Sequence, residues 1–239
     1  ININTNLGYT HRHMHKLVDY IQKLRDGNCI KAFKMFTSMD TWGDRAEYLR
    51  TGLDINTWEK NQDIYVQGAK SHITTMVTFN ILSVTSFTDF LAKVLEWRAK
   101  YEDVIPNNLG SDEYVRKIRF DTPYLKEPLQ YDMQILPKEQ FLPYFDKSLK
   151  FIEDNIDEED RTKFSQLEYE KFKRVRDYFA NEQYPEDRIR KGRIDFYKWF
   201  KEIDIRRDTN LLETFPEMEE FMALCKETAQ GEIPLENIG

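Results

Sequence analysis

Polar side chains close several apolar, strand-like segments of this sequence. Ser38 and Asp40 end one such segment, and Thr78 and Asn80 end another. Residues two apart in a strand face the same side, so each pair presents its side chains together. Hydroxyl, amide and carboxylate groups placed in this way can hydrogen-bond a polar ligand. The same residue types also cap strands and begin turns, and for any one of them alone that is the simpler interpretation.

Three histidines near the start of the chain have spacing that could suit a metal. His11 and His15, with His13 between them, would share one helix face at the four-residue spacing of zinc ligands. No H-E-x-x-H motif accompanies them, so an exposed helix start is the favoured interpretation. A position at the mouth of a substrate site is the intermediate alternative. The sequence therefore predicts no metal ligand among these histidines.

Predicted strands and helices alternate along the first half of the chain, and they would position the strand-end residues. Period-two apolar segments and helical apolar stripes follow one another, which is typical of βα units with a parallel sheet, open or closed into a barrel. Ligands of such sheets bind at the carboxyl ends of the strands. The sequence predicts strands over 1–6, 30–39, 72–81 and 115–122, and helices over 11–26, 54–67 and 86–101.

Composition excludes some classes of function. The formal charge is −7, from 35 basic and 42 acidic residues, which argues against general nucleic-acid binding. No apolar run approaches the roughly 20 residues that cross a bilayer, so no membrane association is expected. Two distant cysteines, Cys29 and Cys225, fit a reducing compartment, and a cytoplasmic location is expected.

Read in order, several short segments resemble the radical S-adenosylmethionine superfamily, in particular its members with a shortened auxiliary ("twitch") carboxyl-terminal region. A lone Ser-x-Asp pair would be unspecific, but an ordered series over nearly the whole chain is much more specific. The segments are Asn4–Gly8, Phe36–Gly43, Glu47–Leu53, Thr78–Ser83, Arg119–Leu125 and Asp208–Glu217.

The resemblance implies an α/β fold with an incomplete parallel (β/α) barrel of radical-SAM type over residues 1–125. A connector and a mainly α-helical, twitch-like region would follow over 126–239. It also implies a [4Fe-4S] cluster that cleaves S-adenosylmethionine to a radical, which abstracts hydrogen from a small-molecule or peptide substrate. An electron donor would be a further partner.

The resemblance places the cofactor around three residues. Ser38 and Asp40 would lie by its ribose and methionine part. Arg50 matches an arginine that can reach the cofactor carboxylate, a contact that suits guanidinium geometry. Arg50 could equally be a helix residue that makes a structural salt bridge.

Other positions carried over from the family complete the expected cofactor site. Asn4 and Thr5 close a segment that resembles the third barrel strand, and Asn80 closes the fifth. The segment after the sixth strand would pass near the adenine. The residues of this group are Asn4, Thr5, Asn80, Tyr124 and Leu125.

The chain departs from the family in its cysteines, because it has no C-x3-C-x2-C motif. Cys29 and Cys225 cannot ligate a cluster that needs three thiolates, and both are expected to be small buried hydrophobes. The cluster ligands would then lie outside this chain.

Because residues 1–6 open directly in a strand pattern, the chain is expected to be the rear part of a larger enzyme. That strand would be an exposed sheet edge, and the isolated chain would be less soluble than a longer version.

The sequence is compatible with three functions. The first is part of a radical S-adenosylmethionine enzyme, in which the chain alone is inactive and binds the cofactor weakly or not at all. The second is a degenerate, non-catalytic barrel that acts as a binding or partner protein. The third is an unrelated α/β enzyme, which is disfavoured because the sequence has neither a glycine-rich phosphate loop nor a G-x-S-x-G elbow.

Overall fold

A computed structural model of the chain describes residues 1–104 and 116–231 and has an α/β fold built on a four-stranded parallel sheet. The sheet order follows the chain, so β1 and β4 are its edges, and the predicted edge position of the first strand is confirmed. The predicted strands all exist but are shorter, and position 115 lies outside the described residues. The strands are β1 (Asn2–Thr5), β2 (Lys34–Ser38), β3 (Ile73–Met76) and β4 (Ile118–Asp121).

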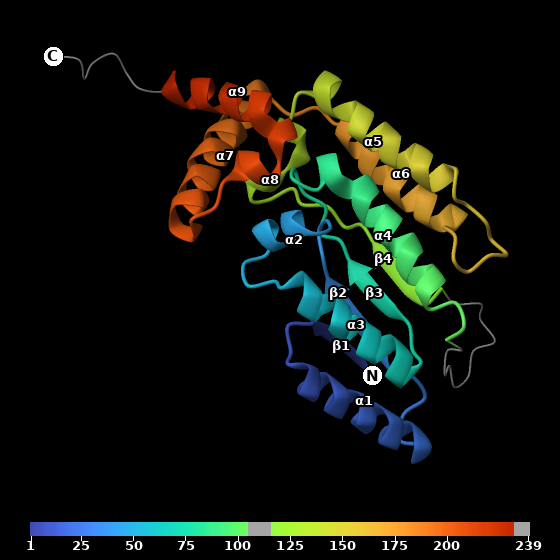
Figure 1. The fold of residues 1–239 in the computed structure, drawn as a ribbon. Helices are drawn as coiled ribbons and strands as arrows, with labels where there is room; N and C mark the ends of the chain where they lie inside the picture. The colour runs from blue at the N-terminus through green and yellow to red at the C-terminus, as the bar shows by residue number, and fades with distance from the viewer. Residues whose placement is uncertain (105–115, 232–239) are drawn as a thin grey trace.

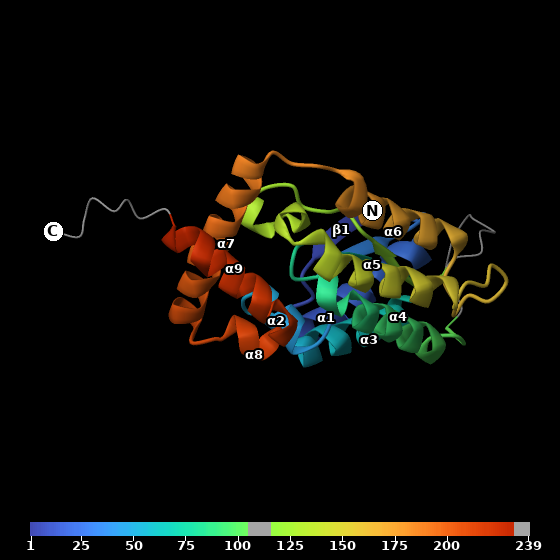
Figure 2. The ribbon, with the colours of Figure 1, turned by 90° about the horizontal axis from the view of Figure 1, so that it is seen from above.

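Helices connect consecutive strands on one face of the sheet (Figures 1 and 2). The long ones, α1 (His11–Asp26), α3 (Ile55–Ala69) and α4 (Phe87–Lys100), match the predicted ranges to within two residues, and a short α2 (Asp44–Leu49) precedes α3. Helices α1 and α3 pack closely at Gly68. A Cβ there would lie 2.7 Å from Val18 Cγ1, so a larger residue at this position would force the helices apart.

The two faces of the sheet differ in polarity. In β2, Met35 and Thr37 are buried against the helices, where the Trp58 Nε1–H donates to Thr37 Oγ1 at 3.1 Å. The alternate residues, Phe36 and Ser38, point to the opposite face, which the three long helices leave uncovered. We call this second face the open face of the sheet.

The second half of the described chain is helical, as predicted. Helices α5 and α6 pack beside α4 and β4, whereas α7 to α9 lie beyond the carboxyl ends of the strands (Figure 1). None of the described helices combines the length and apolar character needed to cross a membrane. The long helices are α5 (Lys138–Glu153), α6 (Gln166–Asn181), α7 (Glu186–Arg207) and α9 (Glu219–Gln230). The short elements are η1 (Val84–Ser86), η2 (Leu129–Tyr131), η3 (Met133–Ile135), α8 (Leu211–Thr214) and η4 (Pro216–Met218).

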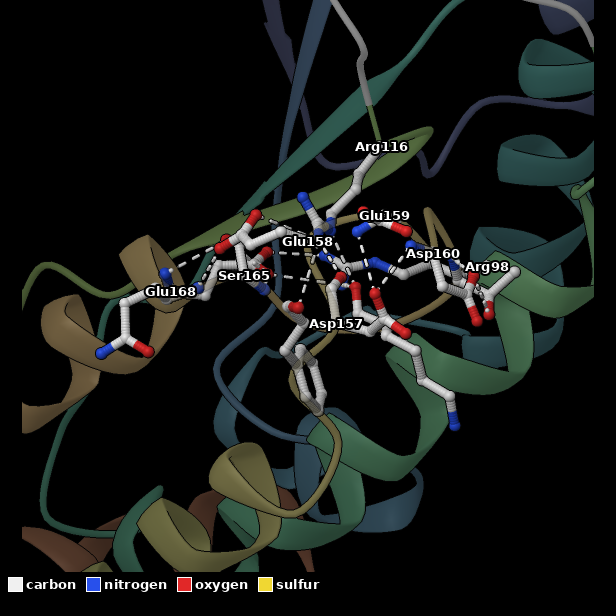
Figure 3. Close-up of polar contacts among 12 residues, drawn as sticks. Arg98, Arg116, Asp157, Glu158, Glu159, Asp160, Ser165 and Glu168 are labelled. Carbon is white, nitrogen blue, oxygen red and sulfur yellow. Dashed lines mark hydrogen bonds and ion pairs between the residues drawn. The ribbon is translucent and has the colours of Figure 1, made fainter.

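A network of polar contacts fixes α6 against α4 and β4 (Figure 3). The buried Arg98 guanidinium binds the Glu168 carboxylate, with 2.6 Å between Nη2 and Oε1. Arg116 donates to the backbone carbonyls of Asp157, Lys163 and Phe164. Asp157 belongs to the acidic run 153–161, so Arg116 ties this run to the segment just before β4.

Candidate functional site

Asp40 and Arg50 form a side-on ion pair just beyond the end of β2. Arg50 Nη2 lies 2.9 Å from Asp40 Oδ1, and Arg50 Nε lies 2.9 Å from Oδ2. The backbone N–H of Thr78, which follows β3, donates to Asp40 Oδ1 at 3.0 Å. The Asp40 carboxylate therefore joins the ends of two neighbouring strands to the segment after α2.

Local backbone geometry brings Arg50 back to the strand end. Gly43 has φ of +68°, a conformation that favours glycine, and it immediately precedes α2. Helix α2 is only six residues long, and Arg50 follows it in an extended conformation. The reversal at Gly43 and the short helix together return the chain to Asp40.

The two side chains of the Asp40–Arg50 ion pair differ in their exposure to solvent. The Asp40 side chain is 9 % exposed, whereas that of Arg50 is 30 % exposed. Burial raises the pKa of the Asp40 carboxyl, and the charge and hydrogen bonds of Arg50 and the Thr78 N–H oppose that rise. Arg50 thus holds a buried carboxylate on one side and reaches solvent on the other.

Asn80 shapes the loop that follows β3. Its Nδ2 donates to the Thr78 carbonyl at 3.0 Å, and its Oδ1 accepts from the Leu82 N–H at 3.0 Å. The Asn80 N–H in turn donates to Ser83 Oγ at 3.2 Å. Asn80 is buried and fixes the wall of the site by these turn contacts, which is the turn-forming role that asparagine has in many loops.

Tyr124 and Leu125 lie beside Phe79 in a short parallel extension of β3 and β4. The Leu125 N–H donates to the Phe79 carbonyl at 2.9 Å, and Phe79 and Tyr124 form a β-bridge. The Tyr124 ring stacks on Tyr178 of α6, with 4.4 Å between centroids. Leu125 reaches the strand-end site, whereas Tyr124 packs against the helical region.

Four of the predicted site residues line one pocket of about 290 Å³, which we call the carboxyl-edge pocket. They are Asp40, Arg50, Asn80 and Leu125. The pocket has an apolar side as well as the ion pair. Its remaining lining residues are Leu49, Thr78, Pro128 and Tyr131.

Asn4 and Ser38 line a second, adjacent hollow of about 560 Å³ on the open face. Ser38 is the last residue of β2 and Asp40 lies two residues beyond it, and the two hollows have no lining residue in common. Thr5 lies in neither, because it faces the other side of β1, where its Oγ1 accepts from the Leu7 N–H at 3.0 Å.

Sequence reasoning missed the contribution of the connector after Pro123. Pro128 and Tyr131 close one side of the carboxyl-edge pocket, and the Tyr131 carbonyl accepts from the Ile81 N–H at 3.0 Å. The Tyr131 hydroxyl also accepts from Trp199 Nε1 of α7. The resemblance implied a connector after residue 125, but nothing in the sequence indicated which strand end the connector would cover.

The cysteines and histidines do not assemble a metal site within the described residues. Cys225 is buried in α9, as predicted, and burial raises the pKa of its thiol to about 12. The prediction that Cys29 is buried is wrong, because the turn after α1 leaves it exposed. His11, His13 and His15 are exposed on the first turns of α1, and His13 Nδ1 lies 2.9 Å from Thr10 Oγ1.

The chain was compared with protein-family models, with curated proteins and with solved structures, and no match was found.

Proposed function

We propose that this chain is the S-adenosylmethionine-binding part of a radical S-adenosylmethionine enzyme, with the cofactor at the carboxyl-edge pocket. The observation that carries the proposal is that Asp40, Arg50, Asn80 and Leu125 line one pocket at the end of β2, where Arg50 stays 30 % exposed although it pairs with Asp40. The ordered strand-end segments of the sequence led to the same residues independently of any geometry. The parallel sheet supports the proposal because ligands of such sheets bind at this edge.

The lining of the pocket suits the parts of S-adenosylmethionine. Nη1 of Arg50 has no hydrogen-bond partner among the described residues, and the side chain is partly exposed, so it could donate to a ligand carboxylate. The Asp40 carboxylate and Thr78 hydroxyl offer acceptors and a donor for ribose hydroxyls. Leu49 and Leu125 provide an apolar surface for the adenine. The adjacent hollow at Ser38 and Asn4 would give the remainder of the molecule room.

The residues of this chain do not fit a [4Fe-4S] cluster. Such a cluster needs three thiolates close together, whereas Cys29 is exposed after α1 and Cys225 is buried in α9. In the proposal, the cluster ligands and the contact with the electron donor belong to residues outside this chain. The residues of the chain bind and orient the cofactor, and a small-molecule or peptide substrate would lie next to it.

Ligand-observed NMR with S-adenosylmethionine tests the proposal on the chain itself. Without the cluster we expect weak binding, with Kd of about 1 mM or above. Arg50→Ala should weaken binding by about 1.5–3 kcal/mol, the range for a hydrogen bond to a charged group. Arg206→Ala is a matched control, because Arg206 makes an exposed ion pair with Glu202 on α7. Equal binding by both variants would make Arg50 structural and remove the basis of the proposal.

A non-catalytic binding protein with a radical-SAM-like sheet is the second candidate function. The positions of Cys29 and Cys225 favour it, because neither cysteine lies near the carboxyl-edge pocket lining. The coding sequence upstream of Ile1 separates the two candidates. A C-x3-C-x2-C motif there would favour the enzyme, and an initiator codon directly before Ile1 would favour the binding protein.

A further inference from the structure

A second cavity, of about 530 Å³, lies on the open face and runs from Lys34 and His72 at the amino ends of the strands to Met76 and Asp121 at their carboxyl ends. We call it the amino-end cavity. It is bounded by β2, β3 and β4 and by the start of α6, so it is separate from the carboxyl-edge pocket in its lining residues. Phe36 and Met76 give it an apolar wall, whereas the Phe120 ring packs against Phe87 and Phe90 on the helix-covered face. Its other lining residues carry an unusual concentration of charge.

Each acidic group of the amino-end cavity already has a cation of its own. Figure 3 shows two of these pairs at the junction of β4 and α6. None of the three carboxylates therefore needs a further cation from the cavity wall. The pairs are Lys171 with Asp121 at 3.1 Å, Arg116 with Glu158 at 3.7 Å, and Arg98 with Glu168 at 2.6 Å.

Two cations of the cavity are left over. Lys34, at the start of β2, and Arg119, in β4, have no carboxylate partner among the described residues. The strand register places Lys34 level with His72 and Arg119 level with Thr74, all on the open face. Lys34 of β2 and Arg119 of β4 thus lie on either side of β3 and line the same cavity, where their like charges repel each other unless an anion binds between them.

His72 lies between these cations and is buried, with 7 % of its surface exposed. Its ring lines the cavity, and its Nδ1 has no hydrogen-bond partner among the described residues. Burial, together with the charges of Arg119 and Lys34, lowers the pKa of His72 to about 4. The ring is therefore neutral near pH 7, when it can donate one N–H to a ligand without adding charge.

The amino end of α6 does not account for the positive character of the cavity. Ser165 and Glu168 form a capping box, and Glu158 Oε1 accepts from the Gln166 N–H at 2.6 Å. The first N–H groups of this helix are therefore already occupied by protein acceptors. What remains for a ligand is the set of Lys34, His72 and Arg119 beside the apolar wall.

We propose that the amino-end cavity binds a phosphate monoester, with the phosphate held by Lys34, Arg119 and His72 and its organic part against Phe36 and Met76. A dianion matches two uncompensated cations, and a phosphate has oxygens enough to accept from all three side chains. The cavity volume lies in the range of small-molecule sites. This site shares no lining residue with the carboxyl-edge pocket, whereas Phe36 and Met76 also line the hollow at Ser38 and Asn4.

Calorimetric titration with inorganic phosphate and with phenyl phosphate, at constant ionic strength, tests this site. We expect both to bind, and phenyl phosphate to bind more tightly because its ring can contact the apolar wall. Lys34→Gln and Arg119→Gln should each raise Kd by about tenfold. The controls Lys31→Gln and Arg174→Gln remove exposed cations that do not line the cavity and should leave Kd unchanged.

NMR titration of the His72 ring measures its pKa with and without phosphate. If His72 had only a structural role, phosphate would leave this pKa unchanged. Bound phosphate should raise the pKa of His72, since the anion offsets the charges of Lys34 and Arg119. Absence of binding at 10 mM of either probe, on the millimolar scale expected here, would overturn the proposal. The proposal would also be overturned if the control variants lost as much affinity for the probes as Lys34→Gln and Arg119→Gln. Phenol that binds as tightly as phenyl phosphate would overturn it too, because the site would then recognise the ring and not the phosphate.

Discussion

Arg98 of α4 and Glu168 of α6 form an ion pair that is almost completely shielded from water, with side-chain exposures of 1 % and 9 %. Arg98 Nε also donates to the Ile118 carbonyl at the start of β4, and its Nη1 donates to the Lys163 carbonyl. One guanidinium thus joins two helices, a strand and a loop. Glu168 in addition closes the capping box of α6.

Replacing Arg98 by alanine should destabilise the protein strongly. The change leaves the Glu168 carboxylate buried without its cation, and it removes hydrogen bonds to two carbonyls. We expect a loss of about 3–5 kcal/mol in the free energy of unfolding, measured by urea denaturation. Arg176→Ala, which breaks the exposed pair with Asp146, should cost less than about 1 kcal/mol. Similar losses for both variants would contradict the structural role given to Arg98.

Asp40→Asn should destabilise the fold moderately. Asparagine can still accept from the Thr78 N–H, but Arg50 loses its counter-charge. Because Arg50 is 30 % exposed and water screens it, we expect only about 1–2 kcal/mol. The comparison variant is Asp146→Asn, whose exposed pair with Arg176 should contribute about 0.5 kcal/mol or less. An Asp40→Asn protein as stable as this control would show that the pair does not fix the strand end.

His72 should make the protein less stable in mild acid. Its pKa is about 4 in the fold against 6.5 in the unfolded chain, so the unfolded state binds the extra proton first. The stability that depends on neutral His72 is complete above about pH 6.5 and is lost as pH falls toward 4. The loss should reach about 3 kcal/mol over this window. Urea denaturation at pH 7.0, 5.5 and 4.5 measures it.

His72→Gln should flatten that pH dependence, although other carboxylates still contribute a slope in common with the wild-type protein. His13→Gln is the control, because His13 is exposed on α1. If His72→Gln retained the full wild-type slope between pH 7.0 and 4.5, the acid sensitivity would have another origin.

The two cysteines should differ sharply in reactivity. Cys29 is exposed, whereas Cys225 is buried and the pKa of its thiol is raised to about 12. Because the thiolate is the reactive form, a thiol reagent such as 5,5′-dithiobis(2-nitrobenzoate) should modify one thiol in the native protein and two in denaturant. In a Cys29→Ser variant the native reaction should disappear. Fast modification of native Cys225 would contradict its position in the core.

The strand and helix order was predictable because apolar residues recur about every two residues in β2 and β3 and about every 3.6 residues in α3 and α4. Strand lengths were overestimated, since regular pairing of β3 ends at Met76 and only an isolated bridge at Phe79 and a few backbone hydrogen bonds continue beyond it. The exposure of Cys29 could not be foreseen, because a cysteine between a helix and a strand carries no sequence signal for burial.

The candidate site was predictable in part for a similar reason. Parallel strand order brings the ends of β2 and β3 together, which places Asp40 beside Thr78 and Asn80, whereas Ser38 lines a different hollow. By contrast, the contacts of Tyr131 and Arg98 depend on how the helical half packs on the sheet, and those partners are 50 or more residues away in sequence. Such long-range pairings leave no local pattern. The same holds for the charges of the amino-end cavity.

The most direct test of the S-adenosylmethionine site is a titration of the ¹⁵N-labelled protein with this ligand, followed by amide NMR. We predict that shifts concentrate at the Thr78 and Leu125 amides and at the Arg50 Nε–H, which line the carboxyl-edge pocket. The Lys34 and Arg119 amides, beside the amino-end cavity, should not move. Shifts confined to other parts of the chain would contradict the assignment of this pocket, and tight binding without the cluster would contradict the expected dependence on cluster ligands outside the chain.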